Sequence, residues 1–159
     1  MQARPLEKRD FDFVVQVIDR WWGGPTGVLA HPIFFYELGD LARVVDDNGV
    51  MVGFLFGFIS RSREFGDVGY VHLVGTHPDY RRRGIARLLY QTFERDCRAA
   101  GVAKLKAVAA VGNEVLQRFH QALGWDMSEV DGYAGPGRNR VVFTKDLLTG
   151  TSGGNPAAS

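Results

Sequence analysis

The dipeptide Asn48-Gly49 lies between two apolar segments and constrains the fold more than any other feature of this 159-residue chain. Both residues accept a positive φ angle, which the two central positions of a type I′ turn require, so the pair predicts a β-hairpin. We therefore expect residues 41–46 to pair antiparallel with residues 50–60. The longest apolar run, residues 50–59, has ten residues, whereas a membrane-spanning helix needs about 20. A buried strand is the better interpretation of this run.

The rest of the chain alternates between strand and helix patterns. A third strand is predicted over residues 68–74, where Tyr70, His72 and Val74 alternate with Val71 and Leu73. The order predicts one α/β domain over residues 1–148, with a mixed, mostly antiparallel sheet flanked by helices. The small, polar residues 149–159 are expected to form a disordered tail. Apolar spacing places the other elements in these ranges: a helix capped by Asp10 and running to about residue 20, helices over 85–100 and 113–123, a short helix or turn over 32–38, and strands over 104–111, 125–130 and 140–145.

Composition excludes several classes of function. The chain has 19 Lys+Arg and 18 Asp+Glu, a net charge of +1, so bulk charge does not predict nucleic-acid binding. One cysteine and four histidines without ligand spacing predict neither a disulfide nor a metal site. Because Cys97 faces the core side of its helix and has no adjacent base, we expect no acyl-cysteine intermediate. The N-terminus has no apolar core of a signal peptide, which predicts a cytoplasmic protein with no membrane partner.

Three arginines, Arg81, Arg82 and Arg83, precede a helix that begins near Ile85. The positive end of a helix disfavours each cation by a few tenths to ~1 kcal/mol, so a bound anion would relieve the repulsion. Free backbone N–H groups, the small Gly84 and the guanidinium groups together predict a phosphate or pyrophosphate site. The alternative is that the arginines simply extend into water. Neither a P-loop nor a dinucleotide-binding glycine motif is present.

Two stretches of the chain resemble motifs of the GNAT N-acetyltransferases. The first is the family's acetyl-CoA signature, Arg/Gln-x-x-Gly-x-Gly/Ala, which here reads Arg81-x-x-Gly84-x-Ala86 after a strand that ends in Val74-Gly75-Thr76-His77-Pro78. The second is the family's Asn…Phe-Tyr…Leu-Gly-Phe segment, to which residues 113–125 are similar. The resemblance covers residues 41–147, whereas residues 1–40 match only the family's general plan of a strand and two variable helices.

The resemblance implies a GNAT-like α/β domain whose central strands splay apart where acetyl-CoA, the acetyl donor, binds. Backbone groups of Val74 and Thr76, on either side of Gly75, would pair with the pantetheine arm as an added strand. Asn113 would contact the cofactor and Phe119 would pack near the pantetheine or the thioester, with helix capping and core packing as the respective alternatives. The pyrophosphate would be held by Arg81, Arg82, Arg83, Gly84, Ile85 and Ala86.

Two histidines are catalytic candidates. The tyrosine with which many family members protonate the departing thiolate corresponds here to His120, which would need a proton or an N–H aimed at sulfur. His72 precedes Val74 by two residues, which predicts that both lie on one side of the strand, and it resembles a water-relaying histidine of some arylalkylamine acetyltransferases. Local bonding and packing are the alternatives for both histidines, and Tyr70 and Glu37 are weaker candidates.

These residues favour transfer of acetyl from acetyl-CoA to a primary amine of a small molecule or peptide, by direct attack in a ternary complex. One alternative is a non-catalytic acyl-CoA-binding regulatory module, which the missing tyrosine favours. The other is a phosphopeptide-binding or anion-binding domain, which leaves residues 113–125 unexplained. A homodimer stays open. An apolar acceptor site is indicated if the aromatic side chains of Trp21, Trp22, Phe34, Phe35 and Tyr36 are not all in the core.

Overall fold

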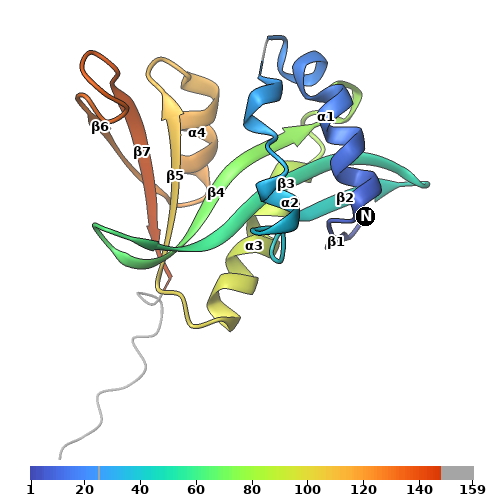
Figure 1. The fold of residues 1–159 in the computed structure, drawn as a ribbon, viewed down its shortest axis with the longest axis horizontal. Coiled ribbons are helices and arrows are strands. Elements are labelled where there is room, and N and C mark those ends of the chain that lie inside the picture. Colours follow the sequence, from blue (N-terminus) through green and yellow to red (C-terminus); the bar gives the residue numbers. More distant parts are fainter. Residues whose placement is uncertain (25, 148–159) are drawn as a thin grey trace, which may run out of the picture.

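A computed structural model describes residues 1–24 and 26–147, in which seven strands form one sheet in the order β1-β2-β3-β4-β5-β7-β6 (Figure 1). The predicted tail, residues 149–159, lies outside the described residues. The strands are β1 (Ala3–Pro5), β2 (Arg43–Asp47), β3 (Val50–Ser62), β4 (Gly66–Thr76), β5 (Lys104–Ala110), β6 (Asp126–Val130) and β7 (Arg140–Asp146). The helices are α1 (Lys8–Trp22), α2 (Ile33–Tyr36), α3 (Ile85–Ala99) and α4 (Glu114–Ala122), with 3-10 turns η1 (Gly27–Leu29) and η2 (Pro78–Tyr80).

Local sequence signals set most element boundaries. Asn48 and Gly49 have φ angles of 49° and 81°, and β2 pairs antiparallel with β3, which confirms the predicted hairpin. α1 begins at Lys8 and is capped by Glu7, three residues before the predicted cap Asp10, because the Asp10 side chain accepts the Glu7 backbone N–H at 2.8 Å. The other predicted elements are confirmed to within two residues at each end, α2 as a short helix inside its range. The short β1 had no predicted range, although the family's general plan for residues 1–40 includes a strand.

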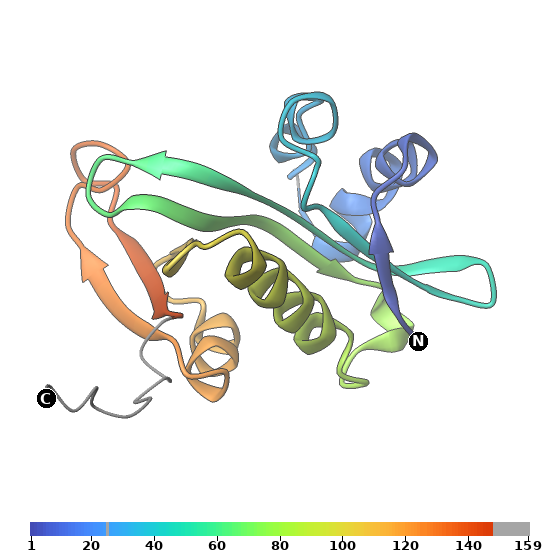
Figure 2. The same ribbon diagram turned by 90° about the horizontal axis from the view of Figure 1, so that it is seen from below.

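An apolar core lies on each face of the sheet. α1 and α2 cover one face, and α3 and α4 cover the other (Figure 2). On the first, the α1 face, Phe11, Val14 and Ile18 recur at helical spacing and are buried. On the second, the α3 face, Leu89 and Phe93 pack in the same manner. The mixed α/β domain is therefore confirmed, with every strand pair antiparallel except β4–β5.

The central strands β4 and β5 splay apart, as the family resemblance implied. They pair in parallel over only three positions, from Gly69 opposite Leu105 to Val71 opposite Ala107. Beyond this point β4 pairs with β3 alone and β5 with β7 alone, and the two strands diverge toward α1 and α4 (Figure 1). The divergence leaves one backbone edge of residues 72–76 open to an added strand.

The predicted alternation of β4 is wrong after Val71. Gly57 of β3 lies opposite Val71, while the preceding residue, Phe56, lies opposite Leu73, so His72 is the extra residue of a β-bulge. Val71 joins the core of the α3 face and Leu73 joins that of the α1 face, although the sequence placed them on one side. A single inserted residue reverses the sides of all the residues that follow it.

The bulge also separates His72 from Val74. His72 lies on the α1 face, where its ring stacks on Phe34 of α2 with centroids 3.9 Å apart. Val74 packs instead against the core of the α3 face. The prediction that these two side chains share one side of the strand is therefore wrong.

Within residues 1–24 and 26–147, no helix has the length and apolarity that crossing a membrane requires. In the same residues, no group of three or more His, Cys, Asp or Glu side chains is arranged to hold a metal ion.

Candidate functional site

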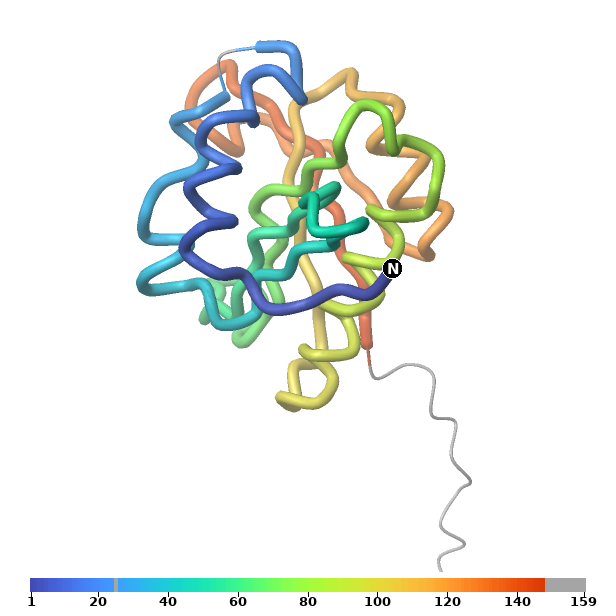
Figure 3. Tube along the Cα trace, turned by 90° about the vertical axis from the view of Figure 1, so that its right-hand side faces the viewer, coloured from blue at the N-terminus to red at the C-terminus, as the bar shows by residue number. Residues whose placement is uncertain are grey.

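A cavity of about 660 Å³ opens between α1, the splayed end of β4, the loop from β4 to α3, and α4. In Figure 3 this loop, in green, lies across from α1, in blue, and overlaps α4, in orange. The cavity brings most of the predicted cofactor residues together, although Arg83 and Asn113 do not line it. Its lining comprises Trp21, Trp22, Val74, Gly75, Thr76, Tyr80, Arg81, Arg82, Gly84, Ile85, Ala86, Arg87, Val115 and Phe119.

The loop before α3 has the geometry of an anion cradle. Gly84 is the N-cap of α3 at φ 77°, and no side chain caps the first N–H groups of the helix. A Cβ added at Gly84 would meet no atom within 4 Å, so that side of the loop is open space. Arg82, with φ 63°, shapes the turn. Exposed N–H groups at the positive end of a helix, flanked by guanidinium groups, fit the pyrophosphate of a coenzyme.

The open edge of β4 lines the same cavity through Val74, Gly75 and Thr76. Backbone N–H and C=O groups of an unpaired strand edge accept an extended partner in the way a neighbouring strand does. This edge fits the amide-containing pantetheine arm. The cradle and the edge together fit a bound coenzyme A along the cavity.

Side-chain contacts hold the cradle loop to its surroundings. Arg81 donates a hydrogen bond to the backbone carbonyl of Trp21, at 2.8 Å, in the last turn of α1. Tyr80 donates its hydroxyl to a carboxylate oxygen of Asp47 at 3.0 Å, which raises the pKa of Tyr80. Arg83 lies 4.7 Å above the Tyr80 ring. Arg81 thus links the cradle to α1, a contact that no local sequence signal predicts.

The second motif contributes one cavity residue and one cap. Phe119 of α4 lines the cavity and packs edge-on against Tyr90, with ring centroids 5.0 Å apart. The side chain of Asn113 accepts the Leu116 backbone N–H at 3.1 Å and caps α4. Capping is the alternative that the sequence left open for Asn113, and its contact with the cofactor stays a prediction.

His72 is half-buried and has a fixed tautomer. Its Nε2 lies 2.9 Å from the carbonyl oxygen of Leu29, and a carbonyl can only accept, so Nε2 carries the proton. Burial lowers the pKa of His72 below its ordinary value of 6.5, and the hydrogen bond to Leu29 offsets part of this effect. At neutral pH the ring is therefore uncharged, and Nδ1 keeps a lone pair that can accept a proton.

His120 is fully buried in the core rather than placed on the cavity wall. Its Nδ1 donates to the Leu116 carbonyl at 2.8 Å, so its Nε2 accepts the Tyr90 hydroxyl at 3.0 Å. The ring stacks on Phe143 with centroids 4.0 Å apart, and burial lowers the pKa of His120. This is the packing role that the sequence left open. The geometry gives no support to protonation of the thiolate by His120, which stays a prediction.

An aromatic surface surrounds His72 on the α1 face of the sheet. Phe34 contacts both His72 and Phe58, and Phe58 contacts Tyr70, with the last two ring pairs 6.0 and 5.5 Å apart. We call Phe34, Phe58, Tyr70 and His72 the acceptor face, after the role that the family resemblance implies for His72. It lies across the sheet from the α3-face core, next to the point where β4 and β5 separate. The exposed Glu37, beyond the end of α2, lines a separate hollow together with Phe58.

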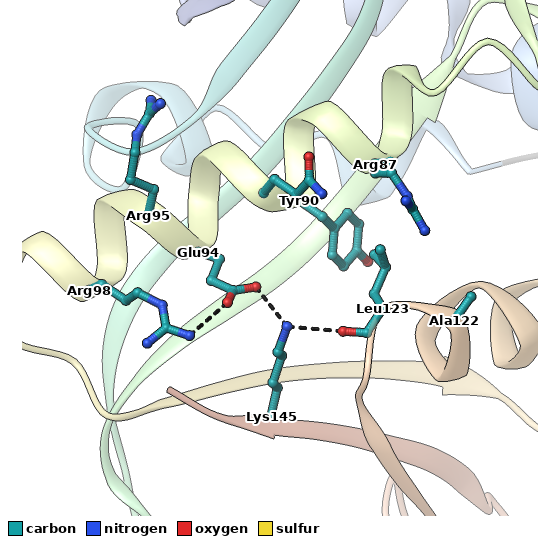
Figure 4. A pocket seen from close by; sticks show the side chains of 9 residues that line it. Arg87, Tyr90, Glu94, Arg95, Arg98, Ala122, Leu123 and Lys145 are labelled. Carbon is teal, nitrogen blue, oxygen red and sulfur yellow. Dashed lines mark hydrogen bonds and ion pairs between the residues drawn. The ribbon is translucent and has the colours of Figure 1, made fainter. Parts of the chain in front are cut away.

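A second hollow of about 410 Å³ lies on the outer side of α3, against α4 and β7 (Figure 4). Its cations are largely engaged within the protein: Glu94 accepts Arg98 and Lys145 at 3.0 Å each, and Lys145 also donates to the Leu123 carbonyl. None of the predicted site residues lines this hollow. The coenzyme fits the first cavity instead.

Known proteins share both the sequence pattern and the fold. The sequence model of the acetyltransferase (GNAT) family matches residues 11–125. Acetyltransferase SG1711 of Sodalis glossinidius is 26% identical over 134 residues, which cover 81% of this chain and 89% of that protein.

Two solved structures show the same fold at low sequence identity. The NatC complex bound to Gag peptide and CoA contains a chain with a TM-score of 0.77 and 17% identity, over 92% of this chain and 99% of that one. The ribosomal-protein-S18-alanine N-acetyltransferase of Escherichia coli has a TM-score of 0.73 and 17% identity, over 97% and 98%.

The family match spans more than half of the chain and includes the cradle, the open edge of β4 and all of α4. The sequence left open an acetyltransferase, an acyl-CoA-binding regulatory module and a phosphopeptide-binding or anion-binding domain. The family and the curated relative are both named as acetyltransferases, which favours the first class. The chain belongs to the GNAT family of acetyltransferases and is an acyltransferase that takes its acetyl group from acetyl-CoA.

Proposed function

We propose that this protein acetylates a primary amine, carried by a small molecule or by a peptide, through direct attack while donor and acceptor are both bound. The observation that carries the proposal is His72, a neutral base with a free Nδ1 on the acceptor face. Acetyl-CoA would supply a thioester that is already activated toward attack by a neutral amine. As the C–N bond forms, the C–S bond would break, and the CoA thiolate would take the second proton that the nitrogen loses, through water. The residues of the protein bind both partners and remove the amine proton.

His72 takes the proton of the acceptor amine in this proposal, through water or directly. An ammonium ion has no lone pair, so the acceptor must lose its proton before it attacks. The hydrogen bond to Leu29 fixes Nε2 as the donor, and Phe34 holds the ring plane. The hydrogen bond occupies Nε2, so Nδ1 is the one ring nitrogen of His72 without a partner in the described chain. This supports Nδ1 as the basic atom.

A covalent intermediate on the protein is not part of the proposal. Cys97 is fully buried between α3 and the sheet, and burial raises the pKa of its thiol to about 12. A thiol of this kind is neither ionised nor reachable by an acetyl donor. Transfer in a single step therefore fits the site better than transfer through an acyl-cysteine.

The named activities of the solved neighbours support an amine acceptor without choosing its size. One neighbour is an alanine N-acetyltransferase of a ribosomal protein, and another is bound to a peptide. The proposal therefore includes both small amines and peptide N-termini as acceptors. A cytoplasmic location and a homodimer stay predictions from the sequence.

The test is the pH dependence of kcat/KM in the parent and in His72→Gln, whose amide can still donate to Leu29 but cannot act as a base. Because the pKa of His72 is lowered, kcat/KM of the parent should fall as the pH drops through a value below 6.5. The pH at which this acidic limb of the profile falls should not change when acceptors of different pKa are compared. His72→Gln should remove the limb and cost roughly 10²-fold or more, whereas the exposed His31→Gln serves as a control that keeps it.

Two results would contradict the proposal. Parallel lines in double-reciprocal plots of initial velocity would indicate a covalent intermediate, whereas intersecting lines are expected for a ternary complex. A folded His72→Gln variant with the parent's rate and pH profile would exclude His72 as the base.

A further inference from the structure

Lys106 of β5 extends the acceptor face by one strand. It lies directly opposite Tyr70 in the parallel pairing of β4 and β5, and Tyr70 lies opposite Phe58 in the pairing of β3 and β4. Directly opposed residues of neighbouring strands point to the same face of a sheet. The Lys106 side chain therefore stands in the same row as the aromatic side chains beside His72.

The ammonium group of Lys106 has no anionic partner in the described chain, although the residue is only 7% exposed. Its contacts are two rings, Phe65 at 5.8 Å and Tyr133 at 5.1 Å. The neighbouring Lys104, by contrast, pairs with a carboxylate of Asp146 at 3.1 Å. Aromatic rings attract a cation weakly and do not neutralise it, so the charge of Lys106 stays available to an anion. Such a side chain is suited to a site that an external anion completes.

Lys106 also lines a mostly apolar pocket of about 260 Å³, together with Phe58, Ser60, Ser62, Val68 and Tyr70. The Ser62 oxygen accepts the backbone N–H groups of Glu64 and Phe65, at 3.2 and 3.4 Å. Its own hydroxyl hydrogen is thus left for another acceptor. An ammonium group and a hydroxyl donor beside aromatic walls form a site for a carboxylate attached to an apolar chain.

We propose that Lys106 binds a carboxylate group of the amine acceptor, so that the protein acetylates acidic amines; this rests on the proposed function. Lys106 is one strand away from Tyr70, which lies two residues before His72. At about 3.3 Å per residue and 4.8 Å between strands, the Cα atoms of Lys106 and His72 are separated by roughly 8 Å. The carboxylate and the nitrogen of the acceptor are therefore several bonds apart. An acidic side chain near a peptide N-terminus and a free ω-amino acid share this chemistry.

The experiment compares acceptors that differ only in this charge. Peptides that begin Ala-Glu and Ala-Gln form one pair, and 5-aminopentanoate and its amide form the other, so the two pairs distinguish a peptide from a small-molecule source. The parent should prefer the carboxylate by roughly tenfold or more in kcat/KM within at least one pair, because a charge-assisted hydrogen bond discriminates by this order. Lys106→Met should abolish the preference and still turn over the amide. Lys104→Met is the matched control and should keep the preference.

A binding measurement separates this inference from the activity on which it rests. With CoA present, the carboxylate compound but not its amide should raise the Tm of the parent, and Lys106→Met should lose the increment. Binding of this kind without acetylation supports the Lys106 site and overturns the proposed function. If the parent turns over acid and amide equally, and Lys106→Met does not change either rate, the Lys106 site is overturned. It is also overturned if every carboxylate compound fails both to bind and to react.

Discussion

Gly84→Val tests the anion cradle, and Gly101→Val is its matched control. Gly84 and Gly101 precede and follow the same helix, α3, with φ angles of 77° and 79°, and an added Cβ meets no atom within 4 Å at either position. The left-handed conformation should cost each variant about 1–2 kcal/mol. For a domain of this size that is a loss of roughly 2–8 °C in Tm. The two variants should therefore be destabilised alike.

Acetyl-CoA distinguishes the two variants. At 100 times its Kd, the cofactor stabilises the native state by about 2.7 kcal/mol, which corresponds to a Tm increment of roughly 5–11 °C. Gly101→Val should keep this increment, whereas Gly84→Val should lose it, because the new side chain occupies the space of the pyrophosphate beside Ala86 and Arg82. Differential scanning fluorimetry with and without acetyl-CoA measures both effects. Equal increments in both variants would refute the placement of the cradle.

Three further changes probe the core and the ion pairs. Cys97→Ala should lower Tm by a few degrees, because the sulfur fills core space, and should leave kcat unchanged; an acetyl group found on Cys97 by mass spectrometry would contradict this. Tyr90→Phe should cost about 1–3 kcal/mol in thermal unfolding by leaving His120 Nε2 without its donor, whereas the exposed Tyr36→Phe should cost almost nothing. Burial alone would raise the pKa of Asp10, but hydrogen bonds from Arg4 and from the Glu7 N–H lower it. The contribution of the Asp10 carboxylate to the free energy of unfolding is thus fully present above about pH 4, and it is lost as the pH falls through the lowered pKa. Urea unfolding of Arg4→Met should show a deficit at pH 7 that shrinks on acidification; a deficit that grows would refute this sign.

Local chemistry along the chain determined much of this protein. The hairpin at Asn48-Gly49 depends on the dihedral preferences of two adjacent residues, and α3 and α4 on apolar spacing within single helices. The cradle follows from Arg81, Arg82 and Gly84 beside one helix start, where the interacting groups are neighbours in sequence. For these features the amino-acid order already contains the cause.

Pairing and burial across distant segments decided the rest. The bulge at His72 arises from the register between β3 and β4, so no pattern within β4 reveals that His72 and Val74 face opposite sides. The core position of His120 depends on its contacts with Tyr90 and Phe143. The charge of Lys106 is left unpaired because the fold brings aromatic rings near it and no carboxylate of the described residues. The sequence alone shows which side chains can carry charge or a proton. The tertiary structure determines which of them are buried with partners and which are left to act on a ligand, because desolvation and hydrogen bonding depend on neighbours in space.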